Sequence, residues 1–112
     1  MSRLSTHVLD VALGQPARGL ALRLEVLEGT IFRPLGAGVT DADGRAGDLL
    51  AGAPLEARTY RLTFETGAYF AASARATFYP RVEVTFEVTA PAGHHHVPLL
   101  LSPFGYSTYR GS

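Results

Sequence analysis

Four histidines are the side chains of this sequence best suited to acid–base chemistry near neutral pH. His94, His95 and His96 are consecutive, and His7 lies near the other end of the chain. Because an unperturbed imidazole changes charge close to pH 6.5, it exchanges protons with water under ordinary conditions. The sequence contains neither cysteine nor lysine. Thiol nucleophiles, zinc–thiolate sites and lysine Schiff bases are therefore excluded.

The spacing of His94 and His96 places both rings on one face of an extended strand, with His95 on the other. His96 is then a candidate general base, or an ordinary surface or interface histidine. His7 shares a face with Leu9 and Val11, which also fits a buried, hydrogen-bonded imidazole. A zinc site formed by His94, His96 and His7 is a minor alternative, because catalytic zinc often has three protein ligands.

Two further groups of polar residues accompany the histidines. Arg45 directly follows the segment Asp41-Ala42-Asp43-Gly44, which predicts a tight turn. The segment is not a calcium loop, because an EF-hand needs a glycine and a glutamate where this chain has Ala46 and Gly52. By sequence alone Arg45 is a solvated charge. The last four residues bring a phenol, a guanidinium and a hydroxyl together: Tyr109, Arg110, Gly111 and Ser112. In most chains such an end is a loose tail.

Alternation of apolar and polar residues predicts strands at residues 20–26, 60–65 and 82–88, each with one face on a core. Residues 4–11 and 94–102 carry apolar side chains on both faces, so a second subunit is expected to cover the outer one. Pro98 has no amide hydrogen, and it therefore marks an edge or a bulge. The run 105–108 is also typical of a strand.

Turn residues separate these segments at 14–16, 34–36, 41–44 and 90–93, and an alanine-rich run predicts one short helix at residues 68–76. The 112 residues fit a single domain, 1–112. The predicted fold is all-β, a sandwich of seven or eight strands with one short helix. Arg23, Arg58 and Arg61 alternate with apolar residues and are interpreted as solvated charges.

Composition limits the partners of the chain. Ten arginines balance ten acidic residues, so the net charge is zero and binding of nucleic acid has no electrostatic basis. No apolar run is long enough to span a membrane. The first seven residues lack the apolar core of a signal peptide, and the expected location is the cytoplasm.

Three motifs together resemble one family. They are Ser5-Thr6-His7-Val8-Leu9-Asp10, the Asp41 to Arg45 segment, and a final stretch that begins His94-His95-His96-Val97-Pro98-Leu99 and ends in Tyr109-Arg110-Gly111-Ser112. The chain is similar over its whole length to the 5-hydroxyisourate hydrolases, the transthyretin-related enzymes of urate breakdown. The resemblance implies a transthyretin-like β-sandwich that assembles as a homotetramer, a dimer of dimers, with active sites in the channel between the dimers.

The resemblance also implies a reaction and its residues. The reaction is hydrolysis of 5-hydroxyisourate to 2-oxo-4-hydroxy-4-carboxy-5-ureidoimidazoline, with no cofactor and no metal. The implied catalytic residues are His7, His96, Arg45 and Ser112, and the implied substrate-binding residues are His7, Arg45, Tyr109 and Arg110. The family often has an aromatic residue where this chain has His95. The alternative is a transthyretin-like carrier that binds an aromatic ligand in the channel without turnover, although transthyretin lacks these histidines and this tail.

Overall fold

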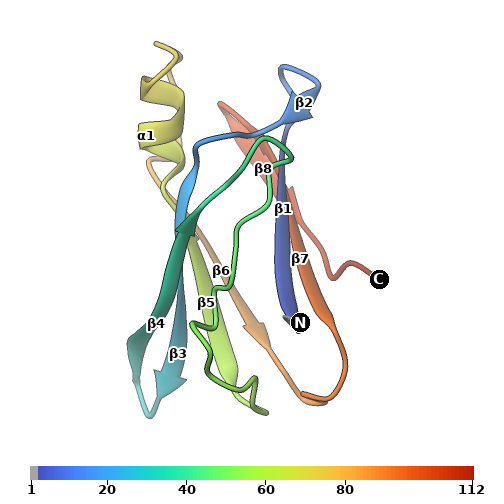
Figure 1. Cartoon of the computed structure of the whole chain (residues 1–112). Helices are drawn as coiled ribbons and strands as arrows, with labels where there is room; N and C mark the ends of the chain where they lie inside the picture. The colour runs from blue at the N-terminus through green and yellow to red at the C-terminus, as the bar shows by residue number, and fades with distance from the viewer. Residues whose placement is uncertain (1–2) are drawn as a thin grey trace.

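Two four-stranded sheets face each other and form a β-sandwich (Figure 1). The structure is a computed structural model that describes residues 3–112; Met1 and Ser2, which open the predicted N-terminal segment, lie outside the described residues. One sheet has the strand order β2-β1-β7-β8, and the other has the order β4-β3-β5-β6. The prediction of a sandwich of seven or eight strands with one short helix is confirmed.

The first sheet contains both histidine segments. Its strands are β1 (Leu4–Asp10), β2 (Gln15–Pro16), β7 (His95–Ser102) and β8 (Gly105–Thr108). β1 and β7 lie side by side and parallel, although some 90 residues separate them in the sequence. β8 adds to β7 in the antiparallel sense. The two ends of the chain are thereby brought into the same sheet.

The second sheet is formed from the middle of the chain. Its strands are β3 (Ala21–Glu28), β4 (Ile31–Val39), β5 (Thr59–Phe64) and β6 (Val82–Glu87), all antiparallel. Burying a large apolar side chain contributes about 1.5–3 kcal/mol, so the inward faces of the strands hold the sandwich together. The fully buried side chains of the core include Val8, Leu20, Leu24, Tyr60, Leu62, Phe64, Phe70, Leu99 and Leu101.

The turn predicted at residues 34–36 is wrong, because these residues lie within β4. Leu24 pairs with Gly36 and Glu25 with Pro34, which leaves Leu35 as the extra residue of a β-bulge. Proline and glycine are tolerated in a strand at such a point. Arg61 also differs from its predicted solvated state: it forms a bidentate ion pair with Glu25, which is only 7% exposed, and lies over the Phe32 ring.

The helix α1 (Thr66–Ala71) is shorter than predicted, beginning two residues earlier and ending five residues earlier. Beyond it Arg75 turns toward β1 and pairs with Asp10, a fully buried carboxylate, at 2.7 Å. Tyr69 of the helix donates its hydroxyl to the same carboxylate at 2.7 Å. The chain leaves the helix through Ala74, whose φ is 54°, and the amide of Arg75 donates to the carbonyl oxygen of Phe70 at 3.0 Å, which closes the helix end. No helix among residues 3–112 is long and apolar enough to cross a membrane.

Candidate active site

The parallel pairing of β1 and β7 brings two predicted catalytic residues onto one surface. Ser5 pairs with His96, and His7 pairs with Pro98 two residues further along the same two strands. Side chains at alternate positions share a face of a strand. His7 and His96 are therefore neighbours on the outer face of the sheet, where both are half-buried. Their partners on the inner face, such as Val8, Val97 and Leu99, belong to the core.

Arg45 reaches this face from the long loop between β4 and β5, two strands of the other sheet. The turn before it forms as predicted, because the Asp41 carboxylate accepts the amide hydrogens of Asp43 and Arg45. The amide of Val8 donates to the carbonyl oxygen of Gly44 at 2.8 Å, and Arg45 forms a β-bridge with His7. This pairing brings the Arg45 side chain, which is exposed, beside His7.

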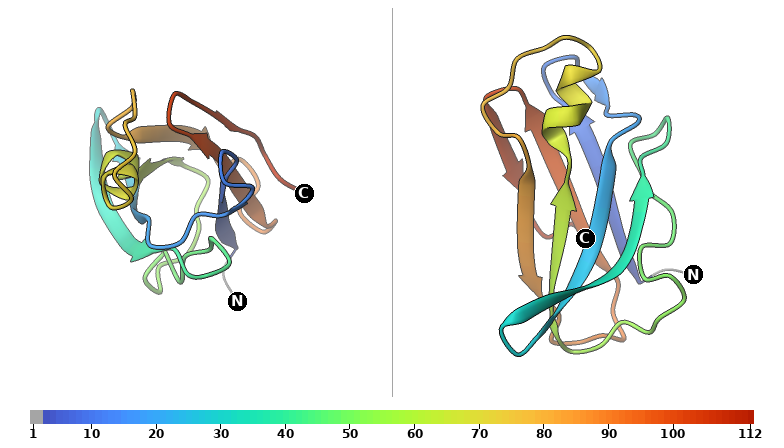
Figure 2. Two further views of the ribbon diagram at one scale, coloured as in Figure 1. Left: turned by 90° about the horizontal axis from the view of Figure 1, so that it is seen from above. Right: turned by 90° about the vertical axis from the view of Figure 1, so that its left-hand side faces the viewer.

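The last residues return to the same surface after leaving β8. Pro98 offers no amide hydrogen, and its carbonyl oxygen accepts the side-chain hydroxyl of Thr108 at 2.7 Å. The ladder between β7 and β8 ends there, as the proline predicts for an edge or a bulge. The chain then moves away over two residues and comes back at Gly111, whose amide donates to the carbonyl oxygen of His96 at 2.8 Å. Both views place the chain end outside this sheet (Figures 1 and 2).

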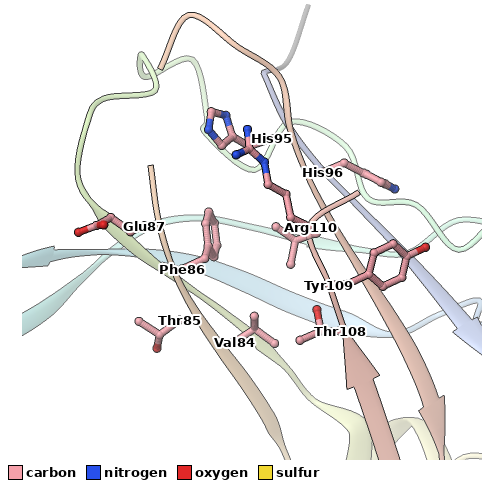
Figure 3. A pocket seen from close by; sticks show the side chains of 10 residues that line it. Val84, Thr85, Phe86, Glu87, His95, His96, Thr108, Tyr109 and Arg110 are labelled. Atoms are coloured by element: carbon pink, nitrogen blue, oxygen red, sulfur yellow. The ribbon is translucent and has the colours of Figure 1, made fainter. Parts of the chain in front are cut away.

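The histidine run alternates as its spacing predicts. His95 is 5% exposed and its Nδ1 lies 3.1 Å from the carbonyl oxygen of Gly93, on the inner side of the strand. Figure 3 shows Arg110 extending to that same side, whereas His96 and Tyr109 point the other way. His95 and Arg110 contribute to a cavity of about 290 Å³ between the tail and β6, which Val84 and Phe86 also line.

The surroundings of His96 favour its neutral form. Partial burial lowers the pKa of the imidazole, because the charged form loses solvation. The positive charges that His7, His94 and Arg45 can carry lower the pKa further, and together these effects outweigh a backbone hydrogen bond with Ser5 that raises the pKa. His96 is consequently available to accept a proton at neutral pH, which a general base requires.

The structure supplies no complete metal-ligand set around these histidines. Within residues 3–112, no three histidine or acidic side chains lie in positions to hold one ion. His94 and His96 instead direct one ring nitrogen each to the Ser5 hydroxyl, both at 2.8 Å. Among these residues the zinc alternative therefore lacks a third ligand.

Not all of the predicted site residues meet. His7, Arg45, His96 and Tyr109 share the outer face, and Ser112 is exposed next to Gly111. Arg110 points toward the cavity near His95, so a substrate contact for it stays a prediction. The sequence analysis missed the role of Ser5. Its alternation with His7 predicts the same face, but only the parallel register places it between two imidazoles.

The fold and this cluster define a β-sandwich with paired histidines and an arginine on the outer face of one sheet. Residues 4–111 match the model of the HIUase/Transthyretin family. A 5-hydroxyisourate hydrolase of the mouse, Mus musculus, is 47% identical over 113 residues, which span 99% of this chain and 96% of that protein. The chain belongs to the HIUase/Transthyretin family.

Solved structures agree with this membership. A 5-hydroxyisourate hydrolase of Klebsiella pneumoniae superposes with a TM-score of 0.85 at 43% identity, covering 97% of this chain and 98% of that one. Sea bream transthyretin, solved in complex with thyroxine, gives a TM-score of 0.91 at 33% identity, covering 98% of this chain and 95% of that one. The backbone of this chain is thus similar to both the hydrolase and transthyretin. The residues of the site, and not the fold, must therefore distinguish hydrolysis from ligand carriage.

Proposed function

We propose that this chain hydrolyses 5-hydroxyisourate in urate degradation, with His7 and His96 as its acid–base pair. The observation that carries the proposal is the meeting of His7, Arg45 and His96 on one face, from three distant parts of the sequence. Similarity to 5-hydroxyisourate hydrolases of mouse and Klebsiella pneumoniae supports the same substrate. The chain is accordingly a hydrolase of the hydroxyisourate type.

In the proposed reaction, one imidazole removes a proton from water while the resulting hydroxide attacks a ring carbonyl carbon. The negative charge then moves to the carbonyl oxygen, where the Arg45 guanidinium donates hydrogen bonds to it. When the intermediate collapses, the ring carbon–nitrogen bond breaks and the second histidine protonates the leaving nitrogen. The net change is the addition of one water molecule and the opening of the ring.

The residues after β8 complete the proposed site. Tyr109 is 57% exposed, and its phenol lies on the side of His96, where it would contact the substrate. Ser112 would add a hydroxyl to the same face. Arg110 would bind substrate after turning away from the cavity near His95.

We further propose that the chain works as a homotetramer, a dimer of dimers, whose outer faces enclose the site. The face around His7 is half-exposed in one chain and includes the apolar Leu9 and Leu100. Excluding bulk water, while the one attacking water molecule stays bound, strengthens the electrostatic interactions in such a site, and an open face does not provide this. Light scattering during size-exclusion chromatography measures the assembly directly, and a stable monomer would contradict this part.

A coupled assay tests the activity. Urate oxidase generates 5-hydroxyisourate, and its ultraviolet absorbance is followed with and without the chain, after treatment with a chelator. We expect faster decay with the chain, and we expect His7→Asn and His96→Asn to lower kcat by about 10²–10⁴-fold, the usual contribution of a positioned general base or acid. His95→Gln, on the other side of β7, is the matched control and should keep its activity per folded molecule.

The same assay separates the enzyme from a carrier. A transthyretin-like carrier would bind an aromatic ligand stoichiometrically and leave the decay at its spontaneous rate. The high TM-score to sea bream transthyretin makes this the alternative worth testing. Unaccelerated decay together with ligand binding that survives His7→Asn would establish the carrier instead.

A further inference from the structure

Ser5 lies between two imidazoles on the outer face of the sheet. Its Oγ is 2.8 Å from Nδ1 of His96 and 2.8 Å from Nε2 of His94. The arrangement follows from the parallel register, which pairs Ser5 with His96 and leaves His94 just before the first residue of β7. The three side chains form one hydrogen-bonded line from a half-buried ring to an exposed ring.

A serine hydroxyl has one hydrogen, so it donates to only one of two nitrogens and must accept a hydrogen from the other. The tautomers of the two rings are therefore linked. If His96 carries its hydrogen on Nδ1, Ser5 accepts it and donates its own hydrogen to a bare Nε2 of His94. The Nε2 of His96 is then bare and free to accept a proton. If Ser5 donates to His96 instead, Nε2 of His96 holds the hydrogen and cannot accept a proton.

Histidines that act as bases are usually oriented by a carboxylate or a carbonyl oxygen on the other nitrogen. In the described part of the chain, neither His94 nor His96 hydrogen-bonds a carboxylate through its ring. The hydroxyl of Ser5 occupies that place. A hydroxyl differs from a carboxylate because it passes a proton on while it remains neutral.

We propose that Ser5 is a positioning residue that sets the tautomer of His96 and connects it to His94, which exchanges the proton with solvent. This inference rests on the proposed hydrolysis and on His96 as its base. When Nε2 of His96 takes a proton from water, Nδ1 releases its hydrogen to Ser5 Oγ, and Ser5 releases its own hydrogen to Nε2 of His94. His94 then carries the added charge at the exposed end and gives its Nδ1 proton to buffer. Before the next turnover Nδ1 of His94 takes a proton from solvent, the hydrogens shift back through Ser5, and Nε2 of His96 releases its proton, which restores the starting tautomers.

The relay also relieves charge in the site. His96 is surrounded by His7 on β1, by Arg45 on the connecting loop and by His94 on its own segment, and each disfavours an imidazolium there. The Tyr109 phenol lies on the same side as His96. When the proton moves to the exposed His94, the positive charge lies on a ring that water can solvate more fully than it can solvate His96.

Three variants test the proposal. Ser5→Ala removes the hydroxyl, Ser5→Thr keeps one, and His94→Gln keeps a hydrogen-bonding group that cannot carry the proton. We expect Ser5→Ala to lower kcat by about 10–100-fold with little change in KM, since a mispositioned or wrong-tautomer base loses rate rather than binding. Ser5→Thr should stay within about threefold of the parent chain. His94→Gln should lose kcat in dilute buffer and regain it when imidazole buffer is added.

A second readout does not depend on turnover. Nitrogen-15 NMR of the His96 ring at pH 8 reports which nitrogen carries the hydrogen. We expect it on Nδ1 in the parent chain and in Ser5→Thr, and on Nε2 in Ser5→Ala. An unchanged tautomer and full activity in Ser5→Ala would overturn the role of Ser5, and failure of imidazole to rescue His94→Gln would overturn the relay. If the parent chain does not hydrolyse 5-hydroxyisourate, the proposed function fails while the NMR result still decides the tautomer.

Discussion

Gly111 donates its backbone amide to the carbonyl oxygen of His96 at 2.8 Å, and it packs directly against the His96 ring. A Cβ atom at Gly111 would overlap Cδ2 of that imidazole and would lie 3.1 Å from its Cγ. The tail therefore reaches the strand only because residue 111 has no side chain. The same contact limits how the His96 ring can turn, which keeps its Nδ1 on Ser5.

The first prediction follows from this contact. Gly111→Ala must either turn the His96 ring or displace the tail, and both change the position of the proposed base. We expect kcat/KM to fall by about 10²-fold, the effect of displacing a reacting group by about 1 Å. The melting temperature should change little, because Tyr109, Arg110 and Ser112 of the tail are exposed. Gly105→Ala in β8 is the matched control, since its Cβ would meet only Ser102 Oγ at an ordinary 3.7 Å.

A second glycine positions Arg45. Gly44 has φ +78°, and a Cβ there would overlap the carbonyl oxygen of Val8 and lie 3.3 Å from Cδ2 of His7. Gly44→Ala should lower the free energy of unfolding by about 1–3 kcal/mol through backbone strain, and it should reduce kcat/KM because Arg45 moves away from His7. Gly47→Ala, where nothing lies within 4 Å, is the control. Equal stability and activity in the two variants would contradict this account of the loop.

Much of the fold could be predicted from alternation alone. Strands such as β3, β5 and β6 have one face on the core and the other polar, so a period of two identifies them. β4 could not be found this way, because Pro34 and Gly36 are typical of turns and the bulge at Leu35 depends on the partner strand. The segment after α1 is held by Asp10, a residue 65 positions from Arg75 in the sequence. Local patterns carry no information about such a partner.

The site was predicted less completely than the fold. Residue types and the family resemblance gave His7, Arg45 and His96, and the structure brings these three together. Their functional roles stay predictions. The alternation of side chains along a strand also predicted that the His95 and His96 rings lie on opposite faces. Ser5 was missed because its contacts require the parallel register of β1 and β7, and a sequence pattern does not reveal which strands pair.

A third prediction concerns the buried Asp10. Burial alone would raise the pKa of this carboxyl, but hydrogen bonds from Arg75 and Tyr69 outweigh burial and lower it. The ionised form therefore stabilises the fold, and this contribution is lost as the pH falls through the lowered pKa. Asp10→Asn should reduce the free energy of unfolding at pH 7 by about 3 kcal/mol, as expected when one partner of a buried ion pair is removed.

Urea unfolding between pH 2 and pH 7 measures this effect. The parent chain should lose stability below the ordinary range of an aspartate, near 3.8, whereas Asp10→Asn should show a flatter profile. Glu28→Gln, which disrupts ion pairs at the surface, is the control and should behave like the parent. An Asp10→Asn chain as stable as the parent at pH 7 would show that the Asp10–Arg75 pair contributes nothing to folding.

The last prediction is the pH dependence of catalysis. A general base acts in its neutral form, so kcat/KM should decline as the pH falls through the pKa of His96 in the free enzyme. Partial burial and the nearby His7, His94 and Arg45 hold that pKa below the ordinary 6.5, so more than half of the activity should remain at pH 6.5.

Arg45→Gln removes one of these positive charges and should move the acidic limb of the pH profile to higher pH, besides weakening substrate binding. Arg18→Gln, an exposed arginine that does not act on His96, should leave the limb in place. A limb centred above pH 6.5 in the parent chain, or one that moves to lower pH in Arg45→Gln, would mean that a different group is the base.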